Sequence, residues 1–148
     1  MTDGLDQSLV AAGIALLRAD TSLVVFPGGV PNLTPAAAPP YVVVYATVEW
    51  PTGTTDALDG LAGSPTARWI AVCVGGGVSG ATPEDAEVAA RAVAQRVRTA
   101  LLNKRLVVAG LNLGLIRQEQ GAGVPTRTDT TGDPVMELIV VYRTLATT

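Results

Sequence analysis

The chain has 148 residues, of which 48% are hydrophobic and only 16% are charged, and its formal net charge is −3. This length fits one domain with a sizeable core, and the acidic balance argues against a dedicated nucleic-acid binder, which would carry a basic face. The chain has no histidine and one cysteine, Cys73, which excludes a Cys/His metal site, a Ser-His-Asp triad and an intrachain disulfide.

The charged fraction is well below the quarter that is typical of soluble proteins, which favours burial of surface in an oligomer. No apolar run is long enough to span a membrane, and no basic segment precedes a short apolar one as in a signal peptide. We therefore expect a protein that is made in a cytoplasm and has no membrane partner.

The N-terminal third predicts a helix, a short strand and a stiff connector. Apolar residues recur at three- and four-residue spacing over residues 5–19, and Asp3 fits the N-cap of that helix. Residues 21–26 predict a short strand that stops at Pro27. The segment 26–40 contains five prolines, each of which fixes φ and lacks a backbone donor, so it can be neither a helix nor a central strand.

The middle of the chain predicts two strands, at 41–50 and 67–74, joined by a loop over 51–66. The first strand is apolar almost without alternation, which predicts a central position covered on both faces. Cys73 lies in the second strand, where we expect a buried small hydrophobic residue.

The clearest helix signal follows at 83–103. Thr82 fits the N-cap, Pro83 fits the first helical position, and Asp85 stands where a capping box has its carboxylate. Another strand is expected within 106–119 and a last one over 135–145, with a polar loop over 120–134. The order predicts one α+β domain, residues 1–148, with a mostly antiparallel sheet of four to five strands and an N-terminal helix and one long helix packed on one side.

Residues Gly75–Gly80 match the dinucleotide-binding pattern G-x-G-x-x-G between a strand and a helix. The helix signal comes after the last glycine, and no acidic residue follows the next strand to bind a ribose. We favour a flexible glycine connector at a subunit contact, and a small nucleotide-binding enzyme that uses Gly75–Gly80 stays as an alternative. We assign no catalytic residue, cofactor or metal.

The candidate interface residues flank the two long loops. Trp50 and Trp69 enclose the loop 51–66, and each is either a core residue that needs a partner for its indole N–H or an interface anchor. Arg68, beside Trp69, and Arg127 and Asp129, in the loop 120–134, are further candidates for contact with a partner.

Short patches along nearly the whole chain resemble the tail terminator (tail completion) proteins of long-tailed bacteriophages. The patches are the turn Phe26-Pro27-Gly28-Gly29-Val30-Pro31, the strand Pro39-Pro40-Tyr41-Val42-Val43-Val44-Tyr45, the Arg-led strand 68–74, the alanine-rich helix 83–103 and the closing Val-Val-Tyr-Arg of 140–143. The resemblance implies a homo-oligomer, a hexameric ring that caps the tail tube, stops tube polymerisation and joins the tail to the head.

Partners and location follow from the same resemblance. It implies contacts with the tail tube protein and with the head-side connector or stopper protein, in the neck of the virion after assembly in the host cytoplasm. DNA would pass through the lumen without specific binding, and we expect the loops 51–66 and 120–134 to make the axial contacts. A head-completion or stopper protein, another neck or minor tail protein, and an unrelated cytosolic oligomer remain alternatives.

Overall fold

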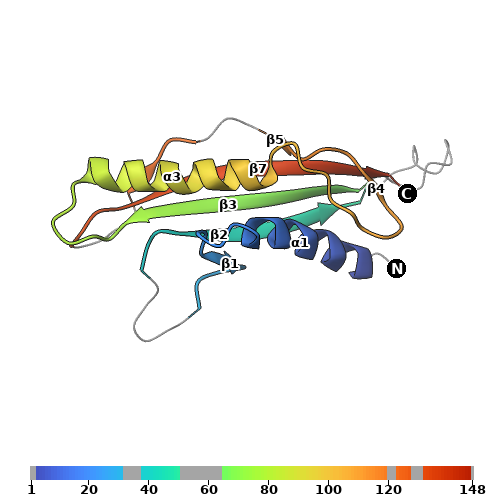
Figure 1. Ribbon diagram of the computed structural model, residues 1–148, viewed down its shortest axis with the longest axis horizontal. Coiled ribbons are helices and arrows are strands. Elements are labelled where there is room, and N and C mark those ends of the chain that lie inside the picture. Colours follow the sequence, from blue (N-terminus) through green and yellow to red (C-terminus); the bar gives the residue numbers. More distant parts are fainter. Residues whose placement is uncertain (1–2, 32–37, 51–64, 120–122, 128–131, 148) are drawn as a thin grey trace.

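The structure is a computed structural model that describes residues 3–31, 38–50, 65–119, 123–127 and 132–147. Most of the expected loop 51–66 and the candidate residue Asp129 lie outside these ranges. In chain order (Figure 1) the elements are α1 (Asp3–Arg18), β1 (Val25–Pro27), β2 (Tyr41–Glu49), β3 (Thr66–Gly76), α3 (Pro83–Leu101), β4 (Asn112–Leu113), β5 (Arg117–Gln118), β6 (Thr126–Arg127) and β7 (Val135–Thr147).

The strands form one mixed sheet with the order β1-β2-β3-β7-β4, and β5 and β6 also pair with β7. Only β1 runs parallel to its neighbour; the other pairs are antiparallel. The predicted α+β class is confirmed. The described residues contribute seven strands rather than four or five, because β4, β5 and β6 have only two residues each.

The two helices of the described residues, α1 and α3, lie side by side on one face of the sheet (Figure 1). A Cβ at Gly13 of α1 would lie 2.2 Å from Trp69 Nε1, and one at Gly75 would lie 2.2 Å from Ala90 N of α3. Trp69 and Gly75 are six residues apart in one uninterrupted strand, so they point to the same face. The core between this face and the helices includes Leu9, Leu17, Trp69, Ala71, Cys73, Ala90, Val97, Leu101, Leu138, Val140 and Tyr142.

The start of α3 agrees with the sequence. Asp85 N donates to Thr82 Oγ1 at 3.2 Å, and Thr82 N donates to Asp85 Oδ2 at 3.0 Å, which is the predicted capping box. The helix ends at Leu101 rather than at residue 103, and Asn103 has a φ of 62°. That left-handed conformation turns the chain away from the helix axis.

The strand β2 is less covered than predicted. Val42, Val43 and Val44 are buried, but β1 pairs with these three residues alone, and the chain leaves the sheet after Pro27. Among the described residues, Tyr45–Glu49 therefore forms an edge of the sheet. The prediction of a central position holds for the first half of β2 and is wrong for the second half.

The region after α3 also differs from the prediction. The strand expected within 106–119 is a pair of short strands, β4 and β5, which contact different parts of β7. The expected loop 120–134 contains β6, in which Thr126 pairs with Glu137 and Arg127 with Met136. Hydrophobic periodicity does not reveal strands of two residues, because a repeat of two needs several residues to be visible.

We expect Gly75→Ala to lower the free energy of unfolding by about 1–3 kcal/mol, because the new methyl group would push α3 away from β3. Urea denaturation measures this change. Gly4→Ala is the matched control, since no atom lies within 4 Å of a Cβ at that position. Equal stability of the two variants would show that α3 does not depend on this close contact.

Candidate functional site

Among the residues that the structure describes, no helix covers the second face of the sheet, which is rich in apolar side chains. Opposed residues of neighbouring strands share a face, and the register aligns Tyr45 with Ile70 and Val141, and Val43 with Val72 and Ile139. The side chains of Tyr45, Ile139 and Leu145 are 45%, 50% and 55% exposed. We call the side chains of Tyr45, Ile70, Val72, Ile139, Val141 and Leu145 the helix-free face. An apolar surface of this kind is typical of a protein interaction site.

Three arginines cross the sheet in one row at the end of the helix-free face. Arg68 of β3 lies opposite Arg143 of β7, which lies opposite Arg117 of β5. Like charges directly opposite each other destabilise a sheet, so this row needs compensation.

Two carboxylates compensate the charge of Arg68 in this row. Arg68 donates through Nε to both carboxylate oxygens of Glu119 at 3.0 Å, and its Nη1 lies 2.8 Å from Glu49 Oε2. These hydrogen bonds, first to Glu119 and then to Glu49, raise the pKa of the Arg68 guanidinium. Arg117 donates to Asn103 Oδ1. The helix-free face therefore ends in a band of both signs of charge, which favours one orientation of a partner.

The two tryptophans have different roles. Trp69 is fully buried against α1, so its side chain offers no surface to a partner; it is a core residue, and its assignment as an interface anchor is wrong. Its Nε1 has no hydrogen-bond partner among the described residues, which costs free energy in a buried site. Trp50 is half-buried, and its Nε1 donates to Asp6 Oδ1 of α1 at 2.8 Å.

The other candidate residues are dispersed. Arg68 lies at the helix-free face, whereas Arg127 lies exposed on β6, at the opposite end of β7. Asp129 is outside the described residues. The structure thus brings none of the four described candidates together with another in one site.

A groove of about 590 Å³ lies between α1 and the uncovered edge of β2. Val10 and Ile14 of α1 line it from one side and Ala46 and Val48 of β2 from the other. Val42 N donates to Val24 O at 2.9 Å, and Val44 O accepts from Gly28 N at 2.8 Å, so the backbone groups of both residues point to this edge. Because these groups alternate along a strand, those of Ala46 and Val48 point to the same edge. Unpaired edges are where further strands or partner chains add to a sheet.

The geometry of the glycine-rich segment opposes a dinucleotide site. Gly75 and Gly76 belong to β3 and pack against α3 and Pro134, so the interpretation as a flexible connector is wrong for these two residues. Gly80 has no atom within 4 Å of a Cβ and makes no close helix–strand contact. At the start of α3, Asp85 supplies a negative charge where a phosphate would have to bind.

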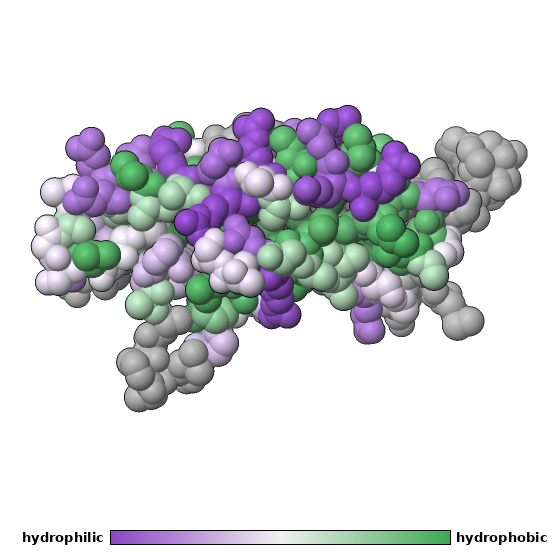
Figure 2. Space-filling model, viewed as in Figure 1, coloured by the Kyte–Doolittle hydropathy of each residue, from purple (hydrophilic) through white to green (hydrophobic). Residues whose placement is uncertain are grey.

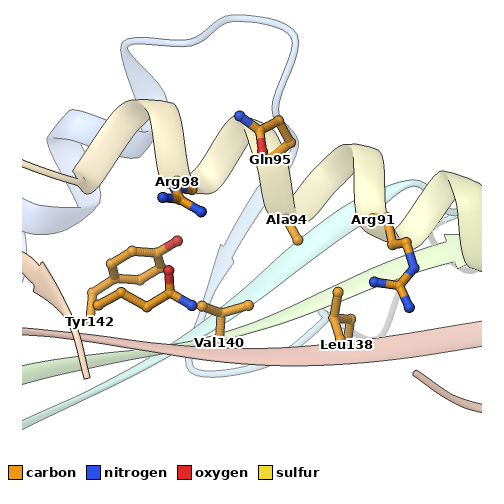
Figure 3. Close-up of a pocket in the computed structure, with 8 residues that line it drawn as sticks. Arg91, Ala94, Gln95, Arg98, Leu138, Val140 and Tyr142 are labelled. Carbon is orange, nitrogen blue, oxygen red and sulfur yellow. The ribbon is translucent and has the colours of Figure 1, made fainter. Parts of the chain in front are cut away.

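A cleft of about 190 Å³, which we call the α3–β7 cleft, separates α3 from β7 and β5. Figure 3 shows the Arg98 guanidinium and the Tyr142 hydroxyl directed toward each other across it, with Ala94, Leu138 and Val140 between α3 and the sheet. Burial, followed by the charge of Cys73, raises the pKa of Tyr142 to about 12, and Arg98 opposes this shift. The hydroxyl is therefore protonated, and a hydrogen-bond donor, at neutral pH.

Sequence reasoning did not find this cleft. Arg98 lies in the last turn of α3, where a cation interacts favourably with the helix dipole, so its presence there needs no cleft. The available signal was Tyr142, a tyrosine on the inward side of an apolar strand, because a buried hydroxyl needs a polar partner.

On the side of the molecule drawn in Figure 2, polar surface follows α3, whereas apolar surface covers α1 and the segment between α3 and β4.

Among the residues that the structure describes, no three Cys, Asp or Glu side chains are grouped so that they could hold a metal ion. No helix in this part of the chain is long and apolar enough to cross a membrane.

Alkaline pH is expected to destabilise the protein through two buried groups. Burial raises the pKa of Cys73 from its ordinary 9.0 to about 12 and is the main cause of the shift of Tyr142 from 10.0 to about 12. The pKa of each group is higher in the folded state than in the unfolded state. Its stabilising contribution is therefore fully present below the unfolded-state pKa and is lost as the pH rises through the folded-state pKa. Urea denaturation should give a decreasing free energy of unfolding above pH 9.0, and Cys73→Ala should flatten the first part of this decrease. A constant free energy up to the folded pKa values would contradict the burial of both groups.

No protein-family model and no curated protein sequence matches the chain. Among solved structures, a chain of one described as the virion of a native gene transfer agent (GTA) particle aligns with 96% of this chain and 96% of its own length. The TM-score is 0.67 and the sequence identity is 19%. The chain therefore shares its fold, over almost its full length, with a component of a virion particle.

Proposed function

We propose that the chain is a structural protein of a phage-like virion and that it acts as a tail terminator, in a ring that caps the tail tube and joins it to the head. The observation that carries the proposal is the fold shared with a chain of the gene transfer agent virion, which spans 96% of both chains. The order of elements also agrees with the resemblance that the short sequence patches indicate.

The helix-free face supports a function in assembly. It exposes apolar side chains, Tyr45, Ile139 and Leu145 among them, next to a band that holds arginines and glutamates. A ring needs heterologous contacts, in which one surface of each subunit meets a different surface of the next. The helix-free face is one such surface, and a second copy of this chain is its proposed occupant.

The uncovered edge of β2 supports the same function. Its backbone groups and the apolar groove beside it offer a place for a segment of an adjacent subunit. The band of Arg68, Glu49 and Glu119 would orient this contact. Trp50, Arg127 and Asp129 remain proposed contact residues, and the loops 51–66 and 120–134 remain the proposed axial contacts to the tail tube protein and the head-side connector.

The lumen of such a ring would let DNA pass. The subunit has a net charge of −3, so a hexamer is negative overall and repels phosphates wherever that charge lines the channel. A protein that holds DNA would instead need a basic groove.

A nucleotide-binding enzyme is the weaker candidate. The capping box occupies the first donors of α3, and Asp85 adds a negative charge beside Gly80. These features oppose a phosphate at the position that the glycine pattern would require.

Removal of the gene from a strain that produces the particles tests the proposal. Without a terminator, tube subunits continue to add, so we expect abnormally long tubes and heads without tails by electron microscopy. Tails of normal length that fail to join heads would favour the stopper alternative and contradict the terminator. Complete, infectious or transfer-competent particles would contradict both.

A further inference from the structure

The second half of β2 has backbone groups that no described strand pairs with. The neighbouring strand β1 pairs with Val42–Val44 and ends at Pro27, and among the described residues no strand continues beside the rest of β2. The N–H and C=O groups of Ala46 and Val48 point to this edge and have no described partner. An open edge of this kind accepts an additional strand.

The groove beside this edge, which we call the α1–β2 groove, is apolar along most of its length. Its volume is about 590 Å³, and α1, which runs beside β2 (Figure 1), lines it with Val10, Ala11 and Ile14. Ala46 and Val48 line the opposite side. Because side chains alternate along a strand, a strand added at this edge would place every second side chain in the groove.

The groove has one charge of each sign, at opposite ends. Asp6 accepts a hydrogen bond from Trp50 Nε1, so the start of α1 lies at the end of β2. Arg18 lies about 18 Å further along the helix, at the end of the groove that Pro27 lines. Among the described residues, neither Asp6 nor Arg18 has an ion pair. A strand of about six residues covers the same distance, since it rises about 3.3 Å per residue.

These features specify the segment that fits the groove. It has apolar side chains at alternate positions, with a basic residue at the Asp6 end and an acidic residue at the Arg18 end. In the whole sequence, an acidic, two apolar and a basic residue follow one another at every second position only over residues 137–143, and the reverse order does not occur. This stretch belongs to β7, which is already paired along both edges. The fitting segment therefore comes from a different protein.

We propose that the α1–β2 groove binds an extended segment of a different protein, which pairs with Ala46 and Val48 as an added strand and has alternating apolar side chains between a basic and an acidic residue. That this protein is another subunit of the particle rests on the proposed function. The binding of such a segment rests on the groove alone.

The probe is the peptide acetyl-Lys-Thr-Val-Thr-Val-Thr-Glu-amide, whose Lys, Val and Glu side chains share one face of a strand. In NMR titrations of the full chain, the peptide should shift the Ala46 and Val48 amide signals downfield and slow their hydrogen exchange. We expect a dissociation constant on the order of 0.1–1 mM. The Thr47 amide, which points to β3, is the internal reference and should change little.

N-methylation of the peptide tests the strand pairing, because only every second N–H of a strand faces a given neighbour. One peptide is methylated at its two Val residues and the other at its last two Thr residues. One of them should bind about tenfold more weakly than the parent peptide, and the other within about twofold of it. Equal binding of the two, or Ala46 and Val48 amides that do not respond to the parent peptide, would overturn the added strand.

Two exposed residues of α1 give a matched pair of variants. Ala11 lines the groove and Ser8 is outside it, so Ala11→Arg should weaken peptide binding about tenfold and Ser8→Arg should leave it unchanged. Arg18→Gln should weaken binding of the charged peptide about two- to fivefold and leave binding of a peptide with Gln at both ends unchanged. An equal loss for both peptides would contradict the recognition of an acidic residue at this end.

Self-association and incorporation into particles identify the source of the segment. Purified Ala11→Arg should self-associate as the wild type does, and in a producing strain its incorporation should be several-fold lower than that of Ser8→Arg. Loss of self-association in Ala11→Arg alone would make a second copy the occupant and overturn a different protein. Equal incorporation of the two variants would overturn a particle subunit as the source, even if the peptide binds. Absence of the wild-type protein from particles would instead contradict the proposed function and leave the NMR result standing.

Discussion

The continuous antiparallel pairing of β3 with β7, from Thr66 opposite Leu145 to Gly76 opposite Val135, determines the arrangement of the other parts of the molecule. Because side chains alternate along a strand, this register sends Trp69, Cys73 and Tyr142 to the helices and Arg68, Val72 and Ile139 to the opposite face. A shift by one residue would exchange the two sets. The core, the helix-free face and the donors of the α3–β7 cleft thus share one structural cause.

The inner side of this pair is shaped by small residues. Gly75 and Ala90 allow α3 to approach β3, and Gly13 accommodates the indole of Trp69 under α1. The close approach leaves little free volume over β3, and the α3–β7 cleft lies beside it, where α3 extends over β7 and β5. On the outer side no helix of the described part of the chain covers the sheet, and Tyr45, Ile139 and Leu145 of the protomer are partly in water. Assembly with a second copy, as proposed, would remove this apolar surface from solvent.

Local sequence signals predicted the elements that depend on local physics. The capping box of Thr82 and Asp85 located the start of α3, and the apolar runs located β2, β3 and β7. The edge position of Tyr45–Glu49 was not predictable in the same way, because it depends on where β1 leaves the sheet.

The sites depend on contacts between distant parts of the chain, and here sequence reasoning was weaker. Whether Trp69 was a core or an interface residue depended on the face that it occupies, which only the register and the position of α1 decide. Arg98 and Tyr142 are far apart in the sequence, and neither belongs to a recognisable motif. Their convergence follows from the packing of α3 on β7, which no spacing in the sequence reveals.

Self-association through the helix-free face is the central claim, and the mass of the purified protein in solution tests it most directly. Light scattering over a range of concentrations should give a closed assembly of about six times the 15.1 kDa subunit, with rings visible by negative-stain microscopy. A mass that stays at 15.1 kDa at every concentration, with and without tail tube protein, would contradict the claim.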